Sequence, residues 1–299
     1  MEYKIENIEG GIRIVGLKNF NLTHIFECGQ AFRWEKTEEE SYIVVAFGRV
    51  VEFFMEGEDL LAYNTGEDDF RKIWHPYFDL DKDYDQIKND LRKTKAFGLN
   101  DSLKEAMDFG YGIRILNQDR FETIISFIIS ANNQIPRIKK SVDLLAQQYG
   151  DFIENYKGKD YYSFPSPGQL KDADPLEVKE VTRVGFRNER IVNTSKAIYN
   201  KDFDLDGFES LSDEKLRSEL IKLEGVGPKV AACILLFAYD RGETFPIDVW
   251  VKRLMETLYI GREIKNKEID IYADEIFGVN KGYAQQYLFY YARENAIGK

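Results

Sequence analysis

The chain has few of the residues that build metal centres and disulfide frameworks. Its 299 residues include only two cysteines, Cys28 and Cys233, and two histidines, His24 and His75. Two cysteines far apart in sequence exclude a four-cysteine zinc site or iron–sulfur cluster and favour a reducing compartment. We therefore expect no iron–sulfur cluster, no histidine-rich metal site and a cytoplasmic location.

Long hydrophobic segments are also missing. No apolar run reaches the roughly 18 residues that a membrane span needs, and the first ten residues, MEYKIENIEG, lack the apolar stretch of a secretion signal. The composition, 43% hydrophobic and 31% charged, is typical of a globular protein. We expect no membrane partner, and the length suffices for one large domain or two to three small ones.

A net positive charge is lacking as well. The formal net charge of −11 argues against indiscriminate coating of DNA, because phosphate contacts come from lysine and arginine. The charge is uneven, however: residues 1–110 carry −9, whereas residues 131–140 and 181–200 each carry +3. A local basic face can therefore coexist with an acidic bulk.

The residue patterns predict an α+β protein. Up to about residue 65, segments rich in β-branched and aromatic residues alternate with turns, which predicts an antiparallel sheet. From residue 70 on, apolar residues recur at spacings of three and four, which predicts helices. Residues 158–175 are expected to form a proline-rich connection with a short helix. We place an N-terminal β domain at 1–105 and a helical domain, with two subdomains and the active site between them, at 106–299.

The most informative stretch spans residues 221–253 and contains LEGVGPKVA followed by FPIDVW. Gly225 and Gly227 permit a tight turn between two helices, and free N–H groups at a helix start bind phosphate. Lys229 lies at that helix start, and Asp248 lies where the next helix should begin. The plainer alternatives are a simple helix–turn–helix connection, a solvated lysine, and an aspartate that serves only as an N-cap.

The two motifs together resemble the helix–hairpin–helix, Gly/Pro-rich loop and aspartate of a large DNA glycosylase superfamily. The resemblance implies that the turn at Gly225 and Gly227 holds a DNA phosphate, and that Asp248 stabilises positive charge on the sugar. A lysine at position 229 is similar to that of the bifunctional glycosylase/AP lyases, whose amine forms a Schiff base before β-elimination. That chemistry requires no cofactor.

Other segments resemble the 8-oxoguanine DNA glycosylases within this superfamily. CGQAFRW matches the segment whose glycine carbonyl, here Gly29, accepts the N7–H that 8-oxoguanine has and guanine lacks. GYAQQYLF matches the helix that completes the base pocket. The resemblance assigns Gln285 to the Watson–Crick edge, Phe289 to stacking on the base, and Cys233 to its opposite face. Taken alone, Phe289 and Cys233 are more typical of ordinary core residues, and CGQAFRW is equally consistent with a plain strand.

Two further segments, SANNQIPRIKK and GFRNER, match those that occupy the gap left by an extruded base. The resemblance places Asn132 in the base stack and Phe186 as a wedge beside the partner base. Arg137 and Arg187 would bond the estranged cytosine, whose O2 and N3 both accept hydrogen bonds. The implied partner is duplex DNA with 8-oxoguanine opposite cytosine, bound by a monomer.

The chain departs from the eukaryotic pattern of this family at several positions. Trp250 stands where a histidine is common, and Ala292 replaces the acidic partner of that histidine. Phe186 and Gln134 stand where tyrosine and asparagine are common. We assign Trp250 to the DNA-binding surface, and we expect the lysine environment and the discrimination for cytosine to differ from the eukaryotic pattern.

The resemblance also implies a structural cation site, because family members can hold a cation through carbonyls of the hairpin. The matching backbone positions are Ile221, Leu223 and Val226. Backbone ligands leave no mark on the side chains, so the sequence pattern itself neither favours nor excludes this site.

The combined interpretation is a DNA repair glycosylase/AP lyase that excises 8-oxoguanine in the cytoplasm, at the nucleoid if the source is bacterial. The enzymatic alternative is a glycosylase of the same superfamily for another damaged base, although the alkylpurine type lacks a lysine at position 229. The non-enzymatic alternative is a DNA-binding module that uses the hairpin only for phosphate. That alternative leaves Lys229, Asp248 and Gln285 without a shared purpose.

Overall fold

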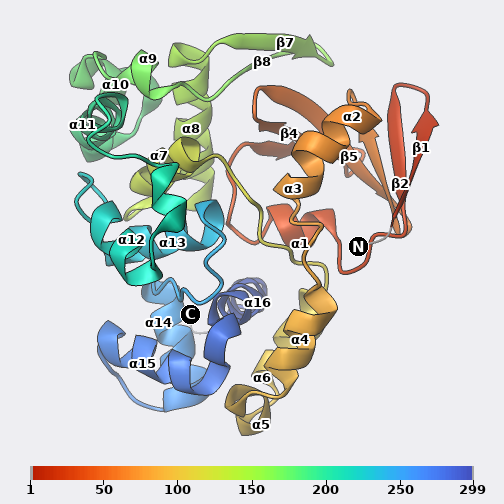
Figure 1. The fold of residues 1–299 in the computed structure, drawn as a ribbon, viewed down its shortest axis with the longest axis vertical. Coiled ribbons are helices and arrows are strands. Elements are labelled where there is room, and N and C mark those ends of the chain that lie inside the picture. Colours follow the sequence, from red (N-terminus) through yellow and green to blue (C-terminus); the bar gives the residue numbers. More distant parts are fainter. Residues whose placement is uncertain (1–2, 298–299) are drawn as a thin grey trace.

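The chain folds into a β-sheet on one side and a larger body of helices on the other, which confirms the α+β prediction (Figure 1). The structure, a computed structural model, describes residues 3–297. All neighbouring strands of the sheet are antiparallel, in the order β1-β2-β6-β5-β4-β3. The strands are β1 (Lys4–Ile8), β2 (Gly11–Val15), β3 (Trp34–Lys36), β4 (Tyr42–Ala46), β5 (Arg49–Glu56) and β6 (Asp59–Tyr63).

The sheet has its own hydrophobic core, formed with the short helices that flank it. These helices are α1 (Leu22–Phe26), α2 (Glu67–Asp69), the π-helical turn η1 (Phe70–Trp74) and α3 (His75–Tyr77). The ring of Phe53 lies 5.0 Å from the rings of both Trp74 and Phe78, and all three side chains are fully buried. Both contacts are edge-to-face, which is an arrangement that aromatic pairs prefer, and they join β5 to the segment of η1 and α3.

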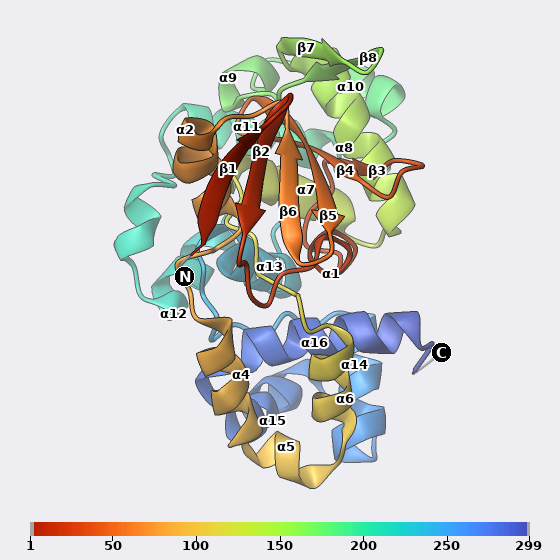
Figure 2. The same cartoon turned by 90° about the vertical axis from the view of Figure 1, so that its right-hand side faces the viewer.

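The helical body consists of two groups of helices. The first comprises α7 (Arg120–Ser130), α8 (Ile135–Tyr149), α9 (Pro167–Leu170), α10 (Pro175–Thr182), η2 (Gly185–Arg187), α11 (Asn188–Tyr199), η3 (Gly207–Ser210), α12 (Asp213–Leu220) and α13 (Pro228–Ala238). The second comprises α4 (Tyr84–Arg92), α5 (Lys95–Leu99), α6 (Ser102–Phe109), α14 (Val249–Met255), η4 (Glu256–Ile260), α15 (Asn266–Phe277), η5 (Gly278–Asn280) and α16 (Lys281–Glu294). Figure 2 shows the second group together at one end of the molecule.

Helices α4, α5 and α6 precede residue 110 but pack with the end of the chain. Leu91 and Leu103 belong to the same buried cluster as Ala284 and Leu288 of α16. The six-stranded sheet ends at Tyr63, well before residue 105. Residues 84–109 pack with the C-terminal helix instead. The division into domains at residues 105 and 106 stays a prediction.

The connection predicted at residues 158–175 is wrong at its start. Strands β7 (Phe152–Tyr156) and β8 (Lys159–Tyr162) form a two-stranded hairpin there, followed by the expected short helix α9. Lys157 and Gly158 join the strands with positive φ angles of 51° and 82°, which is the conformation of a two-residue type I′ turn. In the described range, no helix is long and apolar enough to cross a membrane.

Arg114 connects several of these elements. Its side chain is fully buried, and it donates hydrogen bonds to the carbonyls of Phe78 at 2.9 Å and Lys82 at 3.1 Å. The guanidinium carbon lies 4.1 Å from the centroid of the Tyr84 ring. The residue thus ties the end of the sheet core to the start of α4.

We predict that Arg114→Met lowers the free energy of unfolding by on the order of 3 kcal/mol, because buried carbonyls lose a charged donor. Urea unfolding followed by circular dichroism measures the change. Arg92→Met, at an exposed position of α4, is the matched control and should change stability by less than about 0.5 kcal/mol. Equal effects of the two substitutions would contradict the assignment.

Candidate active site

The predicted hairpin lies between α12 and α13. Val226 N–H donates to the Leu223 carbonyl at 3.1 Å, which closes the turn. Gly225 has a φ of +89°, and a Cβ there would lie 2.9 Å from Cδ of Arg190, so both conformation and packing require glycine. Gly227 is the N-cap of α13, and no atom lies within 4 Å of a Cβ built there. The helix start is therefore open to a ligand.

Lys229 and Asp248 lie at the starts of two successive helices, α13 and α14. Lys229 is in the first turn of α13, half-buried, with its Nζ 5.3 Å from the centroid of the Phe127 ring. The Asp248 carboxylate is the N-cap of α14 and accepts a hydrogen bond from the Val251 N–H at 2.8 Å. Asp248 is therefore an N-cap, as the plainer alternative holds. Only one carboxylate oxygen accepts the cap hydrogen bond, so the capping role does not exclude a second role.

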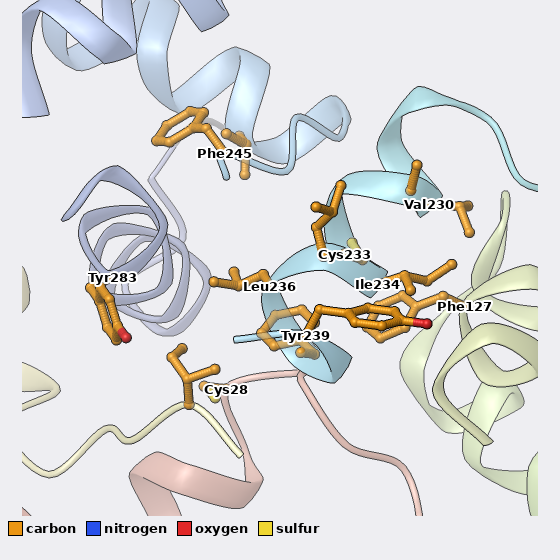
Figure 3. Close-up of a cluster of buried hydrophobic side chains, with 14 of the residues drawn as sticks. Cys28, Phe127, Val230, Cys233, Ile234, Leu236, Tyr239, Phe245 and Tyr283 are labelled. Carbon is orange, nitrogen blue, oxygen red and sulfur yellow. The ribbon is translucent and has the colours of Figure 1, made fainter. Parts of the chain in front are cut away.

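Cys233 lies within the electrostatic influence of both charged groups. It lies one turn after Lys229 on α13 and is 3% exposed. Burial raises the pKa of its thiol, Lys229 lowers that pKa by its charge and by a hydrogen bond, and the charge of Asp248 raises it. In Figure 3, Cys233 projects from α13 within a buried cluster that also includes Phe127 and Cys28.

One pocket of about 470 Å³ brings together the residues predicted to act on the base and the sugar. It is lined by residues from the sheet half of the chain, from the hairpin region and from α16. The predicted residues that line it are Gly29, Cys233, Lys229, Asp248, Trp250, Gln285 and Phe289. These positions span the sequence from one end to the other, and folding is what makes them neighbours.

The wall opposite α13 is formed by Gly29 and α16. Gly29 has a φ of +87°, and a Cβ there would lie 3.4 Å from Cε1 of Phe289. In the described part of the chain, the carbonyl of Gly29 accepts no hydrogen bond, whereas that of Gln30 accepts one from Gln118 at 2.8 Å. Gln285 is 5% exposed, and its Oε1 atom is buried without a hydrogen-bond partner. Two polar groups in the pocket thus lack internal partners.

The two basic segments meet at Arg187. Its guanidinium donates to the carbonyls of Ala131 at 3.0 Å, Asn132 at 3.0 Å and Val184 at 2.9 Å, and the residue is 6% exposed. The guanidinium N–H groups of Arg187 therefore bond the backbone in this structure. Arg187 can contact a base only after some of these hydrogen bonds break. Asn132 is exposed, with a φ of 52°.

Phe186 and Arg137 remain on the surface near this junction. Phe186 is 56% exposed, and the guanidinium carbons of Arg187 and Arg190 lie 4.3 Å and 5.2 Å from its ring centroid. Arg137 is exposed in the first turn of α8. An exposed aromatic ring close to cationic groups is suited to stacking against a base.

The hairpin offers carbonyl oxygens that suit a cation. In the part of the chain that the structure describes, the carbonyls of Ile221 and Val226 accept no hydrogen bond from the backbone outside the helices, and the carbonyl of Leu223 accepts one. Oxygen ligands of this kind fit hard cations. Among the described residues, no group of three or more His, Cys, Asp or Glu side chains could hold a metal ion.

Several residues that line the pocket were not predicted. They include Arg293 and Gln286 of α16 and Phe127 of α7. Arg293 follows Phe289 by four residues, which is one helical turn, so the helical spacing of GYAQQYLF could have pointed to it. Phe127 lies within an apolar helix and carries no sequence signal beyond burial.

Both halves of the chain match families of DNA repair proteins. Residues 13–124 match the family described as the 8-oxoguanine DNA glycosylase N-terminal domain. Residues 125–277 match the family described as the HhH-GPD superfamily base excision DNA repair protein. The second match covers the hairpin, Lys229 and Asp248.

Individual proteins are similar over most of the chain. The 8-oxoguanine glycosylase/lyase of Clostridium acetobutylicum, solved with double-stranded DNA containing cytosine opposite 8-oxoguanine, has a TM-score of 0.92 and 44% identity, covering 99% of this chain and 100% of that one. The N-glycosylase/DNA lyase of Saccharomyces cerevisiae is 28% identical over 90% of this chain and 82% of its own length. The probable N-glycosylase/DNA lyase of Methanothermobacter thermautotrophicus is 30% identical, over 71% of this chain and 73% of its own.

The unpartnered oxygen of Gln285 generates a stability prediction. A buried acceptor without a partner costs about 1–3 kcal/mol, so Gln285→Met should raise the free energy of unfolding of the ligand-free protein by about 1 kcal/mol. Gln286→Met is the control, because Gln286 Nε2 already donates to Cys28 Sγ at 3.6 Å, and it should give no gain. Urea unfolding of both variants checks this, and a clear loss of stability in Gln285→Met would show that the oxygen has a partner.

Proposed function

The chain belongs to the HhH-GPD superfamily of base excision DNA repair proteins, and we propose that it is a bifunctional glycosylase/AP lyase that removes 8-oxoguanine from duplex DNA. The observation that carries the proposal is the pocket that joins Gly29, Lys229, Asp248 and Gln285. The names of the relatives, N-glycosylase/DNA lyase and 8-oxoguanine glycosylase/lyase, support the same activity.

The reaction proceeds on a nucleotide turned out of the duplex into the pocket, since its C1′ is otherwise inaccessible. The neutral amine of Lys229 forms a bond to C1′, while the bond from C1′ to N9 breaks and its electron pair leaves with the base, which takes up a proton. The Asp248 carboxylate stabilises the positive charge that develops on the sugar. Its position as the N-cap of α14 holds that carboxylate in a fixed orientation.

Strand cleavage follows from the covalent intermediate. Opening of the sugar ring gives a protonated Schiff base between Lys229 and C1′. Loss of a proton from C2′ then expels the 3′ phosphate with its bonding electrons. Hydrolysis of the Schiff base by water returns the free amine. No redox partner enters these steps.

The base is selected by the wall that Gly29 and α16 form. The Gly29 carbonyl accepts the N7–H of 8-oxoguanine and would face a lone pair on N7 of guanine. The unpartnered amide oxygen of Gln285 suits an N–H donor on the Watson–Crick edge, while Phe289 and Cys233 cover the two faces of the base. A site built around a hydrogen bond rejects a substrate that lacks the matching group.

The remaining predicted residues bind DNA around the pocket. The backbone N–H groups of Gly225 and Gly227 hold a DNA phosphate at the start of α13, and Trp250 lines the neighbouring pocket. Asn132 and Phe186 occupy the space left by the extruded nucleotide. Arg137 and Arg187 bond the estranged cytosine, Arg187 after exchanging some of its backbone contacts.

A cation at the hairpin would strengthen the phosphate contact. The carbonyls of Ile221, Leu223 and Val226 would hold it, and their free lone pairs support this assignment. The cation supplies positive charge next to the phosphate and takes no part in bond breaking. We expect the protein to act as a monomer in the compartment that contains the genome.

Borohydride trapping tests the mechanism. Reduction of the Schiff base on an 8-oxoguanine·cytosine duplex should yield a covalent protein–DNA adduct, which denaturing electrophoresis detects. Lys229→Gln should abolish the adduct. Lys222→Gln, an exposed lysine on the same hairpin, is the matched control and should leave adduct formation intact. An adduct that persists in Lys229→Gln would contradict the assignment of the nucleophile, and no adduct on any lesion would exclude the lyase.

Asp248→Asn separates the two roles of this residue. Asparagine is as good an N-cap as aspartate, so the free energy of unfolding should change by less than about 0.5 kcal/mol. Loss of the negative charge should lower the single-turnover rate of base excision by about 10²- to 10³-fold, as for other removed charge-stabilising groups. An unchanged excision rate in a folded variant would leave Asp248 with the capping role alone.

A further inference from the structure

We propose that Arg293 is a positioning residue for base discrimination: it clamps the backbone at Glu27 and thereby sets where the Gly29 carbonyl stands in the pocket. The inference rests on the proposed function, since it concerns which base the same pocket accepts. Arg293 is at the C-terminal end of α16, and its side chain is 25% exposed. It was assigned no role by the sequence motifs.

The contacts run from one helix to one short loop. Arg293 Nη2 donates a hydrogen bond to the carbonyl of Glu27, and Gln286 Nε2 donates to Cys28 Sγ at 3.6 Å. A Cβ built on Gly29 would lie 3.6 Å from Arg293 Nη1. The helix that carries Gln285 and Phe289 therefore also holds the two residues before Gly29.

The other side of the loop is anchored independently through Gln30. The Gln30 side chain is fully buried, donates to the carbonyls of Ile25 and Arg114 at 2.8 Å each, and accepts from the Leu116 N–H at 2.8 Å. Gly29 is thus fixed from both directions, and its own carbonyl is left for a ligand. Removal of the Arg293 contact releases the Glu27 carbonyl, while the Glu27 N–H stays bonded to the Thr23 carbonyl at 2.9 Å and the Gln30 side stays in place.

This arrangement links the recognition of two parts of the base. Phe289 and Gln285 contact the ring and the Watson–Crick edge, and Gly29 contacts N7, so the loop must keep a set distance from α16. The lesion and guanine differ at N7 in whether that atom donates or accepts. A misplacement of about 1 Å can cost about 10²-fold in rate, and here the loss falls on the base that uses the Gly29 carbonyl.

A different role for Arg293 predicts a different outcome. Its guanidinium carbon lies 5.8 Å from the centroid of the Phe289 ring and 5.6 Å from that of Tyr290. If it only stabilised these rings or the fold, its loss would slow the excision of any base to the same extent. If it positions Gly29, the ratio of 8-oxoguanine to guanine excision should fall, whereas cleavage at a preformed abasic site should not change.

The experiment compares the full chain with Arg293→Met, Arg293→Lys and Glu294→Gln. Single-turnover rates are measured on matched duplexes with 8-oxoguanine, guanine or an abasic site opposite cytosine. In Arg293→Met we expect the ratio of the 8-oxoguanine excision rate to the guanine excision rate to fall by about tenfold or more, within the range for a misplaced group. Abasic-site cleavage should stay within about twofold. Arg293→Lys, which keeps one charged donor, should recover part of the ratio. Glu294→Gln removes the negative charge that lies 2.9 Å from Arg293 Nη2 but leaves the bond from Arg293 to the Glu27 carbonyl, so its ratio should match that of the wild type.

Each result has one meaning. An unchanged ratio in folded Arg293→Met, or an equal loss of rate on all three duplexes, overturns the positioning role. If Arg293→Met fails to fold, Arg293→Lys decides the question. A reduced ratio in Arg293→Lys supports the proposal. A ratio equal to that of the wild type overturns it, provided that faster amide exchange at Cys28 shows a weakened bond to the Glu27 carbonyl. If the wild type excises no 8-oxoguanine while cleaving abasic sites, the proposed function itself fails.

Discussion

The contact between α16 and the loop around Gly29 is the constraint on which the pocket depends. Gln286 and Arg293 hold that loop while Gln285 and Phe289, on the same helix, face the pocket. The sheet half and the helical half therefore meet at this pocket. Helices α4–α6 reinforce this arrangement from the other side, because they pack against α16 in one hydrophobic core. A substrate pocket shared between distant parts of a chain requires such shared packing.

The opposite wall depends on the start of α13. Gly225 adopts a φ of +89° and Gly227 leaves open space, so the backbone can approach a phosphate closely. Helix α13 carries Lys229 as its second residue and Cys233 one turn after Lys229. Asp248 faces them from the start of α14, where its cap hydrogen bond to Val251 fixes its orientation. Two helix starts thus position an amine and a carboxylate on one pocket.

Much of this could be predicted from the sequence, but not all. The strands up to Tyr63, the helix cap at Asp248 and the hairpin glycines follow from local patterns, and the structure contains each of them. The packing of α4–α6 against α16 could not be predicted, because it joins segments far apart in sequence. The hairpin β7–β8 was missed although Lys157-Gly158 is a two-residue turn. Helical spacing places Arg293 one turn after Phe289, but its bond to the Glu27 carbonyl could not be predicted, because every residue has a backbone carbonyl.

The central claim is that one pocket reads 8-oxoguanine through the Gly29 carbonyl and cleaves the strand through Lys229. The most direct measurement is single-turnover strand cleavage by the wild-type protein on two duplexes that differ only in 8-oxoguanine or guanine at one position opposite cytosine. The account predicts cleavage at the 8-oxoguanine site and at least about 10²-fold slower cleavage at guanine, consistent with rejection by a built hydrogen-bonding site. Equal rates on the two duplexes, or no cleavage of either, would contradict it.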